Sequence, residues 1–222
     1  MSIPQGLAAL EEAINKVSGD FDKAKWLKLN PGKTVRVAFL QEIDADSPFY
    51  NKDAGLALLA VEHANPKNYR AKAQCTIESE GRCFGCEMNQ KHPKTGWNAR
   101  TRLYVNVRVD NGVEDEYVAI LSQGMSDKGI VPSLAMYAQE QGGITNCEFR
   151  MKRNGEGKST SYTIMQIPNS EPADPSKYDL YSLDKVCTRQ IPYAEQEQFY
   201  LGGGDEEQAE EPPSTAGRNL DW

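Results

Sequence analysis

The sequence has no long apolar run. No stretch approaches the ~18 consecutive apolar residues that a membrane-spanning helix requires, so we expect no integral membrane protein. The first five residues, Met1 to Gln5, carry neither the basic segment nor the apolar run of a secretory signal peptide. We therefore expect a cytoplasmic protein with no membrane partner.

Cysteine and histidine are scarce, with five cysteines and two histidines among 222 residues. Without a secretory signal, five cysteines indicate reduced thiols or metal ligands rather than a disulfide framework. The motifs of zinc proteases and zinc deaminases are also missing. Residues 155–159 resemble a phosphate-binding loop, but Lys152 stands where that motif requires glycine, and predicted strands flank the segment. We expect a protein that is not an enzyme.

Three of the cysteines lie in one short stretch. Cys83 and Cys86 form a Cys-x-x-Cys knuckle, in which a tight turn lets two thiolates reach one tetrahedral ion, and Cys75 adds a third thiolate. Both histidines are nearby in the sequence, and either His63 or His92 completes a Cys3His set. A zinc site closed by four protein ligands in this way is structural rather than catalytic.

The alternative interpretation is that these cysteines are small buried side chains, as free cysteines often are. We expect Cys147 and Cys187, which lie in or near apolar runs far from the cluster, to be plain core or surface thiols. Three clustered cysteines with a knuckle and both histidines nearby favour the metal site.

Charge is divided unevenly along the chain. The net charge is −7, yet residues 66–108 carry nine basic and three acidic residues, a local charge of +6. Residues 201–222 carry six acidic residues and Arg218, a local charge of −5. Because the distribution of charge matters more than its total for attracting a polyanion, an acidic chain is compatible with a nucleic-acid partner.

The alternation of apolar and polar residues predicts a mainly β protein. Short strands with one helix before the last hairpin are typical of a five-stranded Greek-key barrel, the OB-fold, and a β-sandwich is the alternative. The predicted strands cover residues 34–40, 56–63, 69–75, 102–109, 116–121, 147–151 and 160–167, and the predicted helices cover residues 5–17 and 130–141.

The same patterns divide the chain into four segments. We expect an N-terminal helix within residues 1–20, then an OB-fold core over residues 21–168 with a zinc-binding subdomain at residues 63–100. Residues 169–201 are rich in proline, serine and tyrosine, and should wrap the core as irregular structure. From residue 202 to residue 222 the composition predicts a disordered acidic tail.

Aromatic residues alternate with basic ones in the positively charged stretch, as binding to single-stranded nucleic acid requires. On the strand at 102–109, four polar residues share one face by period-2 alternation, and four apolar residues share the other. The alternative is an ordinary solvated sheet face. The candidate DNA-binding residues are Tyr69, Arg70, Lys72, Lys94, Trp97, Arg100, Arg102, Tyr104, Asn106, Arg108 and Tyr117.

The acidic tail has two plausible uses: competing with DNA for the basic surface, and offering its tip to basic pockets on replication enzymes. The alternative is a solubilising tail without a partner. The candidate partner-binding residues are Asp205, Glu206, Glu207, Glu210, Glu211, Asp221 and Trp222.

Several motifs occur in an order that resembles a known family. Trp26-Leu27-Lys28-Leu29 precedes the strand Val35 to Leu40, Pro48-Phe49 follows it, and Tyr104-Val105-Asn106-Val107 follows the cysteines. With His63 before the cysteines and acids at the end, residues 20–125 and the tail resemble the zinc-containing single-stranded DNA-binding (helix-destabilising) proteins of tailed bacteriophages. The resemblance favours His63 over His92 as the fourth zinc ligand.

The resemblance implies sequence-independent binding of single-stranded DNA in phage replication, recombination and repair, in the host cytoplasm. It also implies recruitment of replication and recombination proteins through the tail, and self-association on DNA. One departure concerns self-association, because that family begins with a short basic patch and this chain has no Lys or Arg before Lys16. The alternatives are a zinc-ribbon protein-interaction module without DNA affinity and a single-stranded RNA-binding protein.

Overall fold

The computed structural model describes residues 24–113 and 115–202. The predicted helix at residues 5–17 and the partner-binding residues of the tail therefore lie outside the described residues. All seven predicted strands are present, with boundaries shifted by a few residues. They are β1 (Thr34–Phe39), β2 (Leu58–Asn65), β3 (Asn68–Gln74), β4 (Arg100–Asp110), β5 (Tyr117–Gly124), β6 (Glu148–Asn154) and β7 (Ser161–Gln166).

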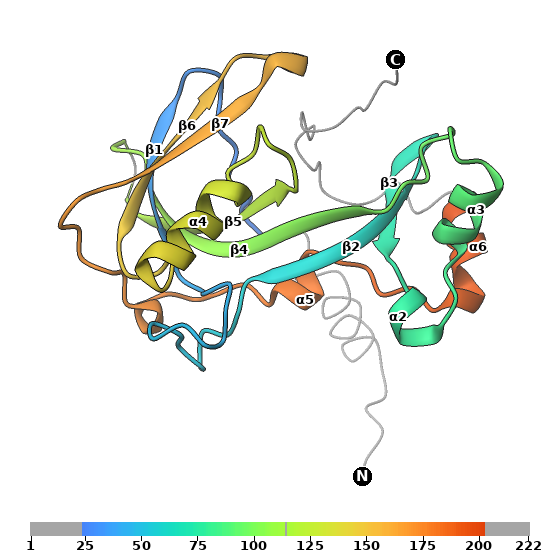
Figure 1. Cartoon of the computed structure of the whole chain (residues 1–222), viewed down its shortest axis with the longest axis horizontal. Coiled ribbons are helices and arrows are strands. Elements are labelled where there is room, and N and C mark those ends of the chain that lie inside the picture. The colour runs from blue at the N-terminus through green and yellow to red at the C-terminus, as the bar shows by residue number, and fades with distance from the viewer. Residues whose placement is uncertain (1–23, 114, 203–222) are drawn as a thin grey trace, which may run out of the picture.

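The strands form one antiparallel sheet in the order β3-β2-β4-β1-β6-β7, and β5 also pairs with β4. The N-terminal half of β4 pairs with β2, its C-terminal half pairs with β1, and β5 follows most of its length. Figure 1 shows β2 and β4 running from the strands β1, β6 and β7 to a lobe at the opposite end of the molecule. β4 is therefore the strand that joins the two ends.

The lobe at the far end of β2 and β4 carries short helices. It contains α2 (Ile77–Glu80) and α3 (Phe84–Lys91), which lie between β3 and β4 in the chain, and α6 (Tyr193–Leu201) from the C-terminal segment. We call this the helical lobe. Its buried apolar cluster comprises Ala71, Ala73, Phe84, Trp97 and Tyr200.

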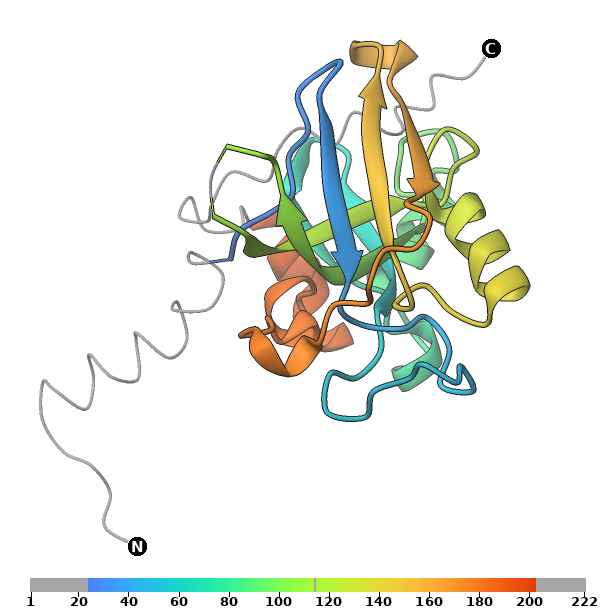
Figure 2. The ribbon, with the colours of Figure 1, turned by 90° about the vertical axis from the view of Figure 1, so that its left-hand side faces the viewer.

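At the other end, β1, β6 and β7 lie side by side, as Figure 2 shows. They pack on the main core, the largest buried apolar cluster, which includes Phe39, Phe149 and Ile164. One face of β4 supplies Leu103, Val105, Val107 and Val109 to this core, as alternation predicts. The predicted helix is confirmed as α4 (Val131–Gln141), with proline in its first turn and Gly142 in the left-handed region at φ 80°.

A closed five-stranded barrel requires a pairing between β5 and β7. No such strand pair occurs among residues 24–113 and 115–202, and the contact in that region is one backbone hydrogen bond from Tyr162 N to Lys128 O at 2.9 Å. The structure therefore establishes a mainly β antiparallel fold without confirming the OB-fold.

The segment after β7 differs from the prediction. Residues 169–201 do run along the sheet, but they form α5 (Leu183–Val186) and α6 rather than irregular structure throughout. Leu183 and Val186 of α5 are buried against Tyr104 and Ile120, on the face of the sheet opposite the main core. We call residues 178–189 the strap. Within the described ranges, no helix is long and apolar enough to cross a membrane.

Candidate metal centre and nucleic-acid interface

Four predicted ligand atoms meet at the base of the helical lobe. One nitrogen of His63 and the thiol sulfurs of Cys75, Cys83 and Cys86 all lie within 4.8 Å of one another. Cys86 Sγ lies 3.3 Å from His63 Nε2 and 3.6 Å from Cys75 Sγ. Metal–sulfur bonds of ~2.3 Å in a tetrahedral site separate two sulfurs by ~3.8 Å, close to the observed spacing. The cluster can therefore hold a metal ion.

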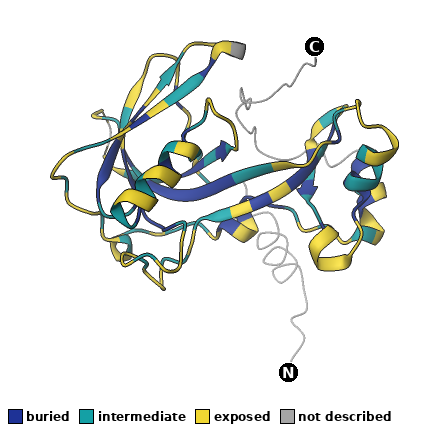
Figure 3. Ribbon diagram, viewed as in Figure 1, coloured by how far each residue is buried: buried dark blue, intermediate teal, exposed yellow. Residues whose placement is uncertain are grey.

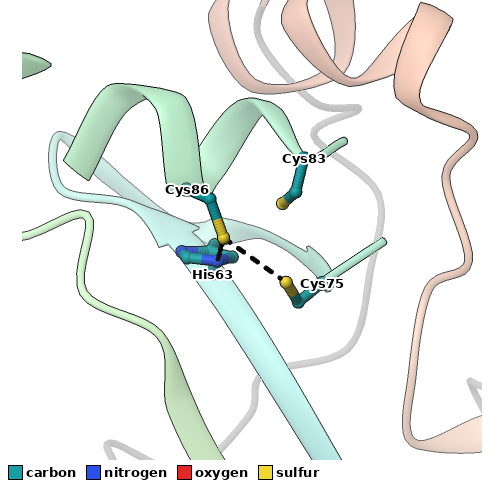
Figure 4. Close-up of side chains that lie close together, drawn as sticks. All are labelled: His63, Cys75, Cys83 and Cys86. Atoms are coloured by element: carbon teal, nitrogen blue, oxygen red, sulfur yellow. Dashed lines mark hydrogen bonds between the residues drawn. The ribbon is translucent and has the colours of Figure 1, made fainter. Parts of the chain in front are cut away.

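Three separate elements supply these ligands, as Figure 4 shows. His63 lies on β2, Cys75 directly follows β3, and Cys83 and Cys86 stand at the start of α3. His63 Nδ1 lies 2.8 Å from the backbone oxygen of Trp97. Because a carbonyl oxygen only accepts, Nδ1 must carry the proton, which leaves the Nε2 lone pair facing the thiols.

The other histidine takes no part in this cluster. His92 is exposed at the C-terminal end of α3. Of the two histidines that the sequence left open, His63 is therefore the one beside the thiols. Cys147 and Cys187 are buried in apolar clusters outside the site, as predicted.

The thiols differ in acidity. Burial raises the pKa of the Cys83 thiol, but the neighbouring His63 ring and hydrogen bonds from the backbone outweigh burial and lower that pKa to about 6. Burial, together with the neighbouring thiols, raises the pKa of Cys86 to about 12, and burial also raises the pKa of Cys75. Cys83 is thus the most acidic of the three thiols, and a bound cation would supply charge that stabilises all three thiolates.

Gly85 is required by the close approach of α3 to β2. A Cβ atom on Gly85 would lie 2.3 Å from Cγ of His63, closer than real Cβ contacts allow. Gly85 lies inside α3, where alanine is otherwise the better helix former. The sequence spacing identified the cysteines of the knuckle but gave no sign of this contact between the glycine and the His63 ring.

Gly85→Ala should therefore displace the His63 ring and weaken metal binding by at least about tenfold. The affinity is measured by competition with a chromophoric chelator. Gly124→Ala is the matched control, because its Cβ would meet open space. Equal metal affinity in the two variants would contradict the proposed role of His63.

Helix α6 packs directly against the metal ligands. The Tyr200 hydroxyl lies 3.3 Å from the backbone oxygen of His63 and 3.4 Å from that of Ala73. The buried side chain of Gln196 accepts from Phe84 N at 2.8 Å and donates to Thr76 Oγ1 at 3.1 Å. These contacts were not predicted, because no local pattern marks a buried glutamine more than a hundred residues away from its partners.

Four predicted DNA-binding bases lie together on the outer face of β3, β2 and β4. Glu62 of β2 stands opposite Gln74 of β3 and Arg100 of β4, so these side chains share one face. Alternation places Arg70 and Lys72 of β3, and Arg102 of β4, on that face too. We call Arg70, Lys72, Arg100 and Arg102 the basic stripe.

An exposed aromatic ring lies beside the basic stripe. Tyr69 is 52% exposed, and the guanidinium of Arg100 lies 5.8 Å from its ring centroid. Arg70 and Arg100 are exposed, whereas Lys72 forms an ion pair with the buried Glu62 at 3.5 Å. Lys94, another predicted residue, is exposed in the loop between α3 and β4.

Three predicted DNA-binding residues are buried, so their assignment is corrected. Trp97 is 5% exposed and packs against Phe84 and Tyr200 in the helical lobe. Tyr104 and Asn106 are fully buried and are contacted by the strap. Figure 3 shows the buried middle part of β4 in dark blue. Alternation correctly placed them opposite the main core, but that face is also covered.

The strap covers Asn106 through a reciprocal pair of hydrogen bonds. Asn106 Nδ2 donates to Tyr181 O at 3.0 Å, and Tyr181 N donates to Asn106 Oδ1 at 3.1 Å. Gln41 accepts from the backbone and the side chain of Asn106. The hydroxyl of Tyr104 donates to Glu62 Oε2 at 2.8 Å. The polar groups of both residues are thus occupied within the protein.

Arg108 and Tyr117 are also corrected. Arg108 is only 12% exposed and forms ion pairs with Glu148 and Glu116, so its charge is neutralised internally. Tyr117 stands opposite Val109, which places it on the face of the main core rather than on that of the basic stripe. The ammonium of Lys25 lies 5.1 Å from its ring centroid.

No protein-family model matches the chain, and no curated protein or solved structure matches it either.

Proposed function

We propose that this protein binds single-stranded DNA without sequence preference and without catalysing a reaction. The observation that carries the proposal is the basic stripe, which gathers four bases on one sheet face beside the exposed ring of Tyr69. Single-strand binding needs cations that follow the phosphates and aromatic faces on which bases stack. Both groups lie here on strands rather than on loops.

The connectivity of five strands supports an OB-fold core. β1 pairs with β4 and β6, β4 pairs with β5, β6 pairs with β7, and α4 lies between β5 and β6. OB-folds bind oligonucleotides on the face of their second and third strands, which correspond here to β4 and β5. The basic stripe extends that face along β2 and β3.

We propose zinc as the metal of the cluster. One imidazole and three thiolates form a closed tetrahedral set of the structural Cys3His type, which leaves no position for substrate. The metal fixes β2, β3 and α3 together, so it holds the strands that carry the basic stripe. It supports DNA binding by positioning these strands rather than by contacting DNA.

The acidic tail extends the proposal to partners. The carboxylates between Asp205 and Glu211 would compete weakly with DNA phosphates, and the tip around Asp221 and Trp222 would bind basic pockets on replication and recombination proteins. In this proposal the protein coats transient single strands during phage replication, recombination and repair, in the host cytoplasm.

Variants of the stripe test the proposal. Tyr69→Ala removes a stacking platform worth ~1–3 kcal/mol, so affinity for an oligo-dT strand should fall about 5- to 150-fold. Arg70→Ala and Arg100→Ala should each reduce the slope of log affinity against log salt by about 0.7.

Lys177→Ala is the matched control, because it removes an exposed base from the short turn at Pro175–Lys177, away from the stripe. If Tyr69→Ala and both arginine variants bind like Lys177→Ala, the DNA surface is misplaced. Competition between poly(dT) and poly(U) separates DNA from RNA, and stronger competition by poly(U) would replace DNA with RNA as the ligand.

A further inference from the structure

An open groove of about 480 Å³ runs between the loop before β2 and the strap. Its lining is mixed: Leu56, Leu58 and Leu180 lie beside Gln41 and Ser182, and Asp53 and Asp184 lie on the exposed rim. Leu56 is 39% exposed. The two carboxylates repel phosphate, so the groove is not a continuation of the basic stripe.

The described part of the chain begins beside this groove. Ala24 packs in the same apolar cluster as Leu58 and Tyr181, which both line the groove. The backbone nitrogen of Lys25 donates to the Tyr181 hydroxyl at 3.2 Å. Residues before Ala24 therefore leave the protein at the edge of the groove.

The preceding segment carries an apolar edge that needs a partner. Leu7, Leu10, Ile14 and Val17 recur at helical spacing, and such an edge is stable in water only when another surface covers it. Residues 18–23 separate this segment from Ala24, and six extended residues span at most about 20 Å. The linker is long enough for the segment to reach the groove beside its own attachment point.

We propose that residues 5–17 dock by this apolar edge in the groove of their own chain. The interaction buries the exposed Leu56 and the half-buried Leu58 and Leu180, and it adds contacts to the side of the strap that faces the groove. The strap covers Tyr104 and Asn106, which lie on the same sheet face as the basic stripe. By holding the strap in place, the docked segment helps to keep that part of the face covered. The docking does not depend on the proposed DNA binding.

Hydrogen exchange in the full-length protein tests this docking. Ile14→Asp places a charge on the apolar edge, so the backbone amides of residues 180–184 should exchange at least about tenfold faster than in the native protein. Ala8→Asp is the matched control, because it adds the same charge on the opposite side of the segment and should leave exchange unchanged.

A second variant tests the groove from the other side. Leu56→Asp places a charge at an exposed groove position, and the amides of residues 7–17 should then exchange at least about tenfold faster. If Ile14→Asp and Leu56→Asp both leave exchange unchanged, the segment does not occupy the groove. If the slow hydrogen exchange of these amides is lost when the protein is diluted, a second copy of the chain occupies the groove. That result would overturn docking within one chain.

Discussion

Chelation of the metal should unfold the helical lobe while leaving the main core of the sheet folded. The apolar cluster of the lobe is small and includes two alanines, so it offers little stability of its own. A structural zinc ion contributes of order 10 kcal/mol to a site of this kind. The amides of α3 and α6 should lose protection, and limited proteolysis should cut between Cys75 and Arg100.

The metal prediction has a matched pair of variants. Cys83→Ser should reduce the bound metal from one ion per chain to a small fraction, whereas Cys187→Ala removes a buried thiol outside the cluster and should retain the ion. Metal content is measured by elemental analysis of the purified protein. If the native protein contains no metal and its amide protection does not change when the chelator is added, the three cysteines are ordinary thiols without a metal.

Glu148→Ala should destabilise the protein by about 3–5 kcal/mol, because it removes a buried carboxylate and leaves the largely buried Arg108 with the exposed Glu116 as its remaining counter-charge. Glu148 is 5% exposed and forms ion pairs with Arg36 and Arg108 across β1, β4 and β6. The Arg108 side chain is 12% exposed, so water replaces the lost carboxylate poorly. The free energy of unfolding is measured by urea titration.

Glu116→Ala is the control for this effect, since it removes the other carboxylate that contacts the same arginine. The Glu116 side chain is 46% exposed, and an exposed ion pair contributes at most about 1 kcal/mol. If Glu148→Ala and Glu116→Ala lower the free energy of unfolding by similar amounts, burial does not decide the strength of these ion pairs.

The cysteines of the candidate metal site were predictable because their pattern is local. A Cys-x-x-Cys knuckle with a third cysteine is recognisable from spacing alone. Local spacing does not decide between the two histidines. His63 lies close to the cysteines because β2 pairs with β3, and Cys75 directly follows β3. The resemblance to the phage family favoured His63 before the pairing was known.

The exposure of the candidate DNA-binding residues was predicted less well than the Cys/His cluster, for two physical reasons. Alternation tells which side of β4 a residue faces, but it does not tell whether another segment covers that side. Asn106 is covered by Tyr181, which lies 75 residues further along the chain. The second reason is the register of the strand pairing, because a shift of one residue moves a side chain to the other face of the sheet. Tyr117 pairs with Val109 rather than with Arg108, so its side chain lies on the face of the main core.

The most direct test of the central claim is a salt titration of binding between the metal-loaded, full-length protein and a fluorescent oligo-dT strand. The account predicts tight binding at low salt that weakens as salt rises, with a slope of about −2 for Arg70, Arg100 and Arg102, since Lys72 is ion-paired with Glu62. Absence of binding at low salt would contradict the account and leave a metal-stabilised protein-interaction module as the better explanation.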